Sequence, residues 1–140
     1  MHEIKVWDPI VRLCHWVTVV IVVLNTTIFD DGKVHEFFGY KVVVLLCVRL
    51  LWGVIGTKYA RFSNFLPTKA KVKAHLRINK TSTHATLGHN PLGAIMVFNL
   101  LITLALICLT GHLMTTDRFW GVEIMEDIHE IFVNYLLLSV

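Results

Sequence analysis

The sequence predicts an all-α integral membrane protein, a four-helix transmembrane bundle whose fourth helix is cut short. Of its 140 residues, 55% are hydrophobic and 16% are charged, whereas soluble domains carry roughly 25% charged residues. Its mean hydropathy is +0.63. Several apolar runs approach the roughly 20 residues that a membrane-spanning helix needs. The length leaves room for one domain, residues 1–140, and for no second.

Three apolar runs are long enough to span. The first covers about residues 10–29 and the second about residues 37–55. The first is expected to remain as an anchor, because the acidic Glu3 and Asp8 precede it and no small-residue cleavage site follows it. The third covers residues 92–114 and is preceded by Pro91, a favoured residue in a first helical turn.

The fourth apolar run starts near Asp127 and ends with the sequence at Val140. Residues 128–140 form 13 residues of helix, or about 20 Å, which is shorter than a hydrocarbon core of about 30 Å. The sequence therefore predicts that the native chain continues past Val140.

The loops differ sharply in charge. Residues 57–90 contain seven Lys and Arg residues and no acid, whereas the loops at 30–36 and 115–127 are rich in Asp and Glu. The positive-inside rule places the basic loop and the N-terminus in the cytoplasm, and both acidic loops outside. Topology accounts for the basic charge, so we expect membrane lipid and no nucleic acid as a partner. We also expect a short amphipathic helix within residues 57–90.

Three histidines lie in or at the start of the apolar runs. His35 and His129 each stand at the outer end of a predicted helix, and His15 lies about one and a half turns into the first helix, on the cytoplasmic side. Ionisable side chains in membrane helices are rare and usually functional. Two neutral imidazoles facing each other across a bundle are the axial ligands that a b-type haem needs.

The shared depth of His35 and His129 predicts that they ligate one haem iron in the outer leaflet. His15 has no such partner in the inner half. A partner for it would stand roughly 14 residues below His129, about 20 Å down the helix, which lies beyond Val140. We therefore expect two haems in the native protein, with the inner one in doubt for this sequence.

Other readings of the histidines stay open. His112, near the outer end of the third run, competes as an outer ligand, and His89 fits a role in positioning its loop. A single helical histidine such as His15 can equally cap or bond a neighbouring carbonyl. Zinc is a weaker reading, because no His-x₃₋₅-His or Cys-x₂-Cys spacing is present.

Two arginines fall inside apolar runs, Arg12 and Arg49. We expect the Arg12 side chain either to reach lipid phosphates or to pair with haem propionates, and we rate the two interpretations as equal. For Arg49, which is deeper, we favour contact with a propionate or a quinone. The absence of Cys-x-x-Cys-His excludes covalent c-type haem, and the three cysteines are expected to be buried packing residues.

Several short motifs together resemble one family, the prokaryotic cytochromes b-561, which are related to the b-type cytochrome subunits of nickel–iron hydrogenases. The similarity covers essentially the whole chain. It is carried by Val6-Trp7-Asp8-Pro9, Arg12, His15-Trp16, His35, Gly39-Tyr40, Arg49, Trp52-Gly53, Gly56-Thr57, Tyr59-Ala60-Arg61-Phe62, Leu87-Gly88-His89-Asn90-Pro91-Leu92-Gly93 and His129-Glu130.

This resemblance implies four transmembrane helices in a bacterial inner membrane and two b haems. His15, His35 and His129 match three of the four family ligands, and the fourth is absent with the end of the last helix. The implied function is electron transfer between a quinone pool, or a partner redox subunit, and another carrier.

Two alternatives come from other functional classes. In the first alternative, the chain is a haem-binding anchor subunit of a hydrogenase or reductase complex. In the second, it is a haem-free helical scaffold or transporter whose histidines serve protons. Possible partners are therefore quinone or quinol, a c-type cytochrome, and a hydrogenase or reductase subunit. Whether it is itself an enzyme stays open. A visible spectrum separates the haem-free alternative from the others.

The charge pattern generates a test of topology. A cysteine introduced in the basic loop, Lys71→Cys, is expected to resist an impermeant thiol reagent on intact cells and to react after permeabilisation. Asp117→Cys in the acidic loop is the matched control and should react without permeabilisation. Labelling of the Lys71→Cys variant on intact cells would show that the orientation is inverted.

Overall fold

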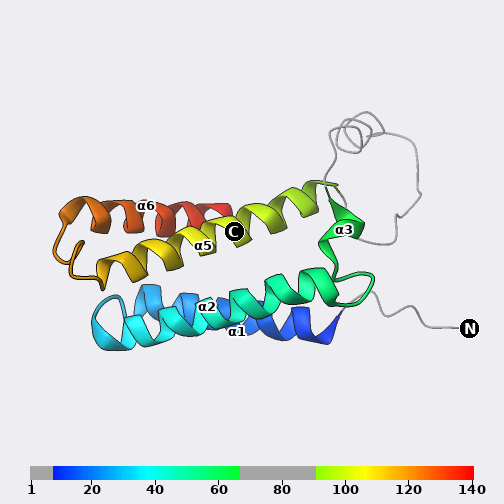
Figure 1. Ribbon diagram of the computed structural model, residues 1–140, viewed down its shortest axis with the longest axis horizontal. Helices are drawn as coiled ribbons and strands as arrows, with labels where there is room; N and C mark the ends of the chain where they lie inside the picture. Colours follow the sequence, from blue (N-terminus) through cyan, green and yellow to red (C-terminus); the bar gives the residue numbers. More distant parts are fainter. Residues whose placement is uncertain (1–7, 67–90) are drawn as a thin grey trace, which may run out of the picture.

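The computed structural model describes residues 8–66 and 91–140, and this part of the chain is all-helical (Figure 1). Its helices are α1 (Pro9–Thr27), α2 (Gly32–Ile55), the short α3 (Phe62–Phe65), α5 (Pro91–Met114) and α6 (Glu123–Ser139). Three of them, α1, α2 and α5, are long and apolar enough to cross a membrane. With 17 residues, α6 is about 25 Å long. Residues 67–90, where most of the expected amphipathic segment falls, lie outside the described residues.

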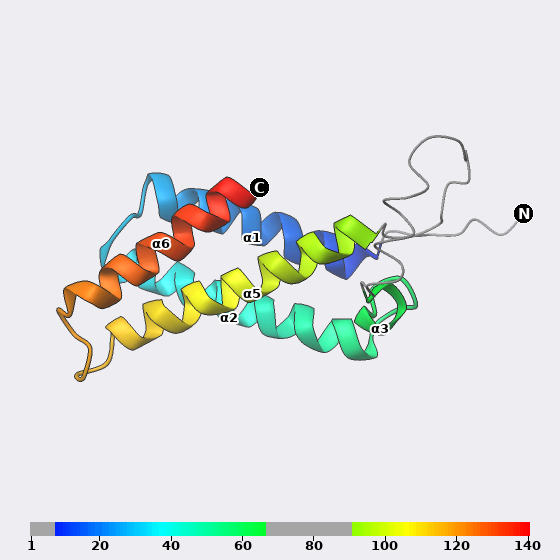
Figure 2. The ribbon, with the colours of Figure 1, turned by 90° about the horizontal axis from the view of Figure 1, so that it is seen from above.

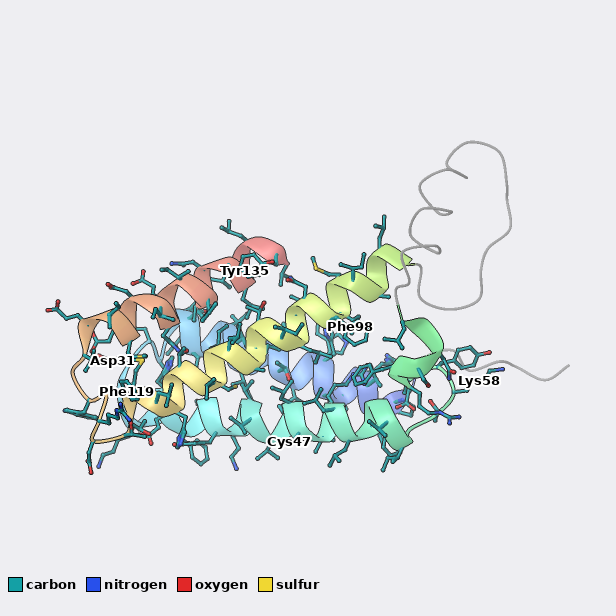
Figure 3. All side chains as sticks on the ribbon, turned by 45° about the horizontal axis from the view of Figure 1, so that its top comes forward. Asp31, Cys47, Lys58, Phe98, Phe119 and Tyr135 are labelled. Atoms are coloured by element: carbon teal, nitrogen blue, oxygen red, sulfur yellow. The ribbon has the colours of Figure 1, made fainter. Side chains whose placement is uncertain are left out.

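The four longer helices form two antiparallel pairs. In Figures 1 and 2, α1 lies beside α2 and α5 lies beside α6, and α2 also packs against α5. The connections α1–α2 and α5–α6 therefore lie at the same end of the molecule. Figure 3 places Asp31 and Phe119 at that end and Lys58 at the other. The two acidic connections share one side, as the charge pattern predicts.

Two helices begin earlier than their apolar runs predict. Helix α2 starts at Gly32 rather than near residue 37, and α6 starts at Glu123 rather than at Asp127. His35 therefore lies in the first turn of α2. Gly32 has a φ of 76°, a conformation that suits glycine. Glu123 and Glu126 occupy the first turn of α6, where the helix dipole favours acidic side chains. Both helices thus begin before their apolar runs, so hydropathy alone underestimates their length.

Asp8 joins the start of α1 to the end of α2. One carboxylate oxygen, Oδ1, accepts hydrogen bonds from the backbone amides of Ile10 (2.9 Å) and Val11 (3.2 Å) and so caps α1. The other, Oδ2, accepts from Trp52 Nε1 (3.1 Å) and Thr57 Oγ1 (2.8 Å). Asp8 is buried, with 7% of its surface exposed. This contact fixes the inner end of the α1–α2 pair.

The charge state of Asp8 follows from these contacts. Burial by itself raises the pKa of its carboxyl, but the hydrogen bonds from Trp52, Thr57 and the two backbone amides outweigh it. The pKa of Asp8 therefore lies below its ordinary value of 3.8. Because the folded pKa is depressed, Asp8 contributes stability above the ordinary pKa, and this contribution is lost as the pH falls through the folded value.

Few side chains fill the interior of the described part. The buried hydrophobic residues are small or medium in size, and no large side chain there is fully buried. They are Cys14, Ile21, Val42, Ala60, Ala94 and Leu136. The expectation of three buried cysteines holds for Cys14 but is wrong for Cys47, which is exposed on α2, and Cys108 is half-buried. The helices enclose a loosely packed centre, and most of their apolar surface faces outward, where hydrocarbon can cover it.

The Asp8 contact generates a prediction with an internal control. Asp8→Ala removes a helix cap and two cross-helix hydrogen bonds, so the melting temperature in detergent should fall by about 5 °C or more. Asp31 precedes α2 in the same way but makes no side-chain cap hydrogen bond, so Asp31→Ala should leave the melting temperature unchanged. The difference between wild type and Asp8→Ala should shrink below pH 3.8. Equal effects of the two substitutions would show that Asp8 does not join the helices.

Candidate functional site

The structure brings His35 and His129 together. Their ring centroids lie 6.2 Å apart and their planes make an angle of 72°. His35 lies in the first turn of α2. His129 is the seventh residue of α6, which begins at Glu123. A metal ion held between two imidazole nitrogens, with bonds of about 2.0 Å, sets the ring centres roughly 6 Å apart. The separation of the two rings is of that size.

In each of the two rings, a hydrogen bond at Nδ1 fixes the orientation of the imidazole. His35 Nδ1 lies 2.8 Å from the carbonyl oxygen of Phe29, which only accepts, so Nδ1 carries the proton in the neutral ring. Phe29 belongs to the short connection between α1 and α2. This leaves His35 Nε2 with its lone pair available. Metal-binding histidines commonly donate their second ring nitrogen in this way.

His129 is held by a hydroxyl on α5. Thr110 Oγ1 donates to the carbonyl of Leu106 (2.9 Å) and lies 2.8 Å from His129 Nδ1. Because the hydroxyl proton goes to Leu106, Nδ1 of His129 donates to Thr110 and Nε2 keeps its lone pair. Thr110 is buried, with 6% of its surface exposed. Both imidazoles thus present the tautomer that an axial ligand needs.

Two glycines stand beside this pair of rings. A Cβ added to Gly111 on α5 would lie 3.2 Å from His129 Cε1, so the absence of a side chain allows the imidazole to approach the helix. A Cβ added to Gly39, one turn after His35 on α2, would meet nothing within 4 Å. Gly39 therefore borders open space next to the His35 ring.

Arg49 lies in the inner half of α2 and has an unsatisfied nitrogen. Its guanidinium carbon lies 4.7 Å from the centroid of the Phe62 ring. The Phe62 ring in turn covers Gly53, in a place that a Cβ at Gly53 would occupy. Nη1 of Arg49 is buried and has no hydrogen-bond partner within the described residues. A buried guanidinium nitrogen of this kind suits an anionic oxygen.

The remaining candidates are not gathered into the same place. His15 is exposed on α1 and its ring contacts Trp16, with centroids 5.4 Å apart. No second histidine of the described chain pairs with it, whereas His35 and His129 pair with each other. Arg12 is also exposed on α1. His112 hydrogen-bonds Tyr40, and His89 lies outside the described residues.

The comparisons identify the class of protein. A family model described as prokaryotic cytochrome b561 matches residues 6–140, and the chain belongs to this family. No curated protein and no solved structure matches the chain. With three helices suited to spanning a membrane, the chain is a multi-pass membrane protein, a b-type cytochrome of electron transfer.

The described residues fit a b-type haem. No cluster of three or more His, Cys, Asp or Glu side chains that could hold a metal ion occurs within residues 8–66 and 91–140, but a haem iron needs only two protein ligands. His35 and His129 supply two imidazoles with free Nε2 atoms. The position of a Cβ on Gly39 has nothing within 4 Å, and no large side chain of the described part is fully buried.

Sequence reasoning missed two residues that hold this arrangement. Nothing in the sequence indicated a role for Thr110, because its partner His129 lies on α6 and comes within reach only when α6 packs against α5. Asp8 was noticed as an acidic residue before the first apolar run and as part of a family motif, but its contacts with Trp52 and Thr57 bridge residues far apart in the sequence. The proline at position 9, at the first turn of a helix, was the available signal that Asp8 is a cap.

Thr110 generates a prediction about haem retention. Thr110→Val keeps the shape of the side chain but removes the acceptor for His129 Nδ1, so haem affinity should fall about ten- to a hundredfold. Thr103 is the matched control, because it is also buried on α5 and its only described hydrogen bond is to the carbonyl of Asn99. Thr103→Val should retain haem. Equal retention by both variants, measured by pyridine haemochrome, would show that Thr110 does not orient His129.

Proposed function

We propose that this protein is a membrane-embedded cytochrome that passes electrons between a quinone pool, or a partner redox subunit, and another carrier, through a haem b with His35 and His129 as axial ligands. The observation that carries the proposal is the pair of imidazoles 6.2 Å apart, each with its Nδ1 proton committed elsewhere.

The chain's own residues determine how this haem works. When bound, the haem supplies an iron that takes up and releases one electron at a time. Phe29 and Thr110 would hold the two imidazoles through Nδ1, so that Nε2 of each ring stays available as a ligand atom. Held by both histidines, the haem would supply electron transfer rather than binding of oxygen at its iron.

The inner half of the bundle supports a narrower proposal. Arg49 stands 14 residues after His35 along α2, about 21 Å away, so it belongs to an inner site rather than to the His35–His129 pair. Its buried Nη1 suits a propionate or the oxygen of a quinone. The proposed ligand of an inner haem is His15, and Arg12, which is exposed on α1, is proposed to face lipid phosphate or a propionate.

The proposed location is a bacterial inner membrane, with the N-terminus in the cytoplasm and residues 1–140 as a single unit. The seven Lys and Arg residues of the stretch 57–90 support this orientation. Eight of the ten acidic residues lie at or near the opposite end, where α2 and α6 begin. These are Asp30, Asp31, Glu36, Asp117, Glu123, Glu126, Asp127 and Glu130.

The acidic end also supports a second candidate function, as the haem-binding anchor of a hydrogenase or reductase complex. A surface of one sign near a redox site raises the rate of encounter with a partner of the opposite sign. A partner subunit or a c-type cytochrome with a basic face would dock there. Copurification from native membranes distinguishes an anchor subunit from a cytochrome that acts alone.

The axial ligation generates a prediction. His35→Ala and His129→Ala should each abolish the six-coordinate low-spin spectrum of this haem, because the iron loses one of its two ligands. His112→Ala is the control, since His112 hydrogen-bonds Tyr40 instead, and it should keep that spectrum. An unchanged low-spin haem in both His35→Ala and His129→Ala, or its loss in His112→Ala alone, would refute the assignment.

A further inference from the structure

A second hydrogen-bonded pair lies close to the two histidines, on the outside of the bundle. The hydroxyl of Tyr40 on α2 and Nδ1 of His112 on α5 are 3.0 Å apart, and their ring centroids are 6.1 Å apart. Both side chains are exposed. The pair therefore bridges the seam where α2 packs against α5, and it faces the surroundings of the protein rather than its centre.

A glycine precedes each member of the pair on its helix. Tyr40 directly follows Gly39, which stands one helical turn after His35, and His112 directly follows Gly111. Among the described residues, nothing stands within 4 Å of the position of a Cβ on Gly39, and the atoms near that of Gly111 belong to His129. The backbone at these two glycines, which we call the glycine wall, therefore adds no side chain between the exposed pair and the proposed haem ligands.

Apolar side chains flank the pair, with one cation among them, since Lys41 Nζ lies 4.8 Å from the centroid of the Phe37 ring. Phe37 and Val44 share the helical face of Tyr40, three residues before it and four after it, and Leu109 lies three residues before His112. They are 56%, 59% and 52% exposed, respectively. A polar pair surrounded by exposed apolar side chains suits a ligand with a polar head and a hydrocarbon tail that is dissolved in the membrane.

We propose that Tyr40 and His112 bind the headgroup of a lipid-soluble 1,4-quinone or its quinol at the outer end of the α2–α5 seam. This inference rests on the proposed function and identifies where its membrane-soluble electron carrier binds. The quinone ring lies against the glycine wall, close to the His35–His129 site, and its isoprenoid tail follows the apolar surface formed by Phe37, Val44 and Leu109.

The pair can hydrogen-bond both redox forms of such a ligand. When the Tyr40 hydroxyl donates to Nδ1 of His112, the Nε2–H of His112 is left as a donor for a quinone carbonyl. When Nδ1–H donates to the Tyr40 oxygen, Nε2 becomes an acceptor for a quinol hydroxyl, and the Tyr40 O–H becomes a free donor. A change of the His112 tautomer, with the ring proton on Nε2 in the first case and on Nδ1 in the second, therefore matches the site to either form without any change in net charge.

The test measures binding to the purified, haem-loaded protein in lipid nanodiscs. The affinities for decylubiquinone and for a short-chain menaquinone are determined separately by quenching of tryptophan fluorescence. Tyr40→Phe and His112→Leu should each weaken the binding of at least one of them about five- to tenfold, the loss expected for one hydrogen bond. His112→Gln, which keeps a donor, should recover part of the affinity.

Tyr135→Phe is the matched control. Tyr135 is also exposed and also donates its hydroxyl to a neighbouring helix, to Asn99 Oδ1 at 2.7 Å, but its position on α6 is remote in sequence from both members of the pair. This variant should bind both quinones like the wild type. Unchanged affinity in Tyr40→Phe and His112→Leu, or an equal loss in Tyr135→Phe, would overturn the site.

Haem content is measured in the same samples, so that a failure of the proposed function can be distinguished from a failure of the proposed quinone site. Absence of haem from the wild-type protein would remove the proposed function. Full haem content with quinone affinities insensitive to Tyr40 and His112 would remove only this inference. Loss of haem from His112→Leu with no change in quinone affinity would identify His112 as an axial ligand and would also overturn the quinone site.

Discussion

A helix surrounded by hydrocarbon gains little by burying apolar side chains against its neighbours, because lipid tails are as apolar as leucine. Under this constraint the few polar contacts between helices determine how the bundle is arranged. Asp8 ties α1 to α2 at the end opposite the acidic connections, and Thr110 ties α5 to α6 through His129 nearer to those connections. Tyr135 and Asn99 add a second contact between α5 and α6. The arrangement of the histidines depends on these contacts more than on a close-packed core.

The same constraint explains the tautomers of the two facing imidazoles. A ring N–H group that found no acceptor in this environment would cost free energy, so each Nδ1–H donates to an oxygen within reach. The carbonyl of Phe29 is available because the chain turns between α1 and α2, and the hydroxyl of Thr110 is available because α6 returns along α5. The packing at this end therefore leaves the lone pairs of both Nε2 atoms available. For the proposed haem, a preformed pair of ligands would lose less freedom on binding than one that must be assembled.

Two glycines, Gly39 and Gly111, also lie at this end of the molecule. Gly39 leaves open space where a Cβ would stand, and Gly111 lets the His129 ring approach α5; each is followed directly by a member of the Tyr40–His112 pair. A cytochrome that exchanges electrons with a carrier dissolved in the lipid needs a short path from the surface to its haem. Two helices whose backbones form the wall provide one without opening the bundle to water. The acidic connections at the same end place a charged surface beside that path.

The sequence by itself determined the membrane class, the helices α1, α2 and α5, and the placement of both acidic connections at one end, because hydropathy and charge are local properties. It also predicted that His35 and His129 share a depth, since depth follows from counting residues along helices of fixed rise. It misplaced the starts of α2 and α6, because these helices extend beyond the apolar runs that were used to find them.

Only the tertiary structure decided what surrounds each of these residues. Which way an imidazole turns depends on the oxygen that lies next to its Nδ1. Neither Phe29 nor Thr110 could be recognised before the helices were packed. The same holds for Asp8, whose partners on α2 and after it stand 44 and 49 residues away, and for His112, which pairs with Tyr40 across 72 residues. Pattern and spacing report on one helix at a time, whereas these contacts exist only between helices.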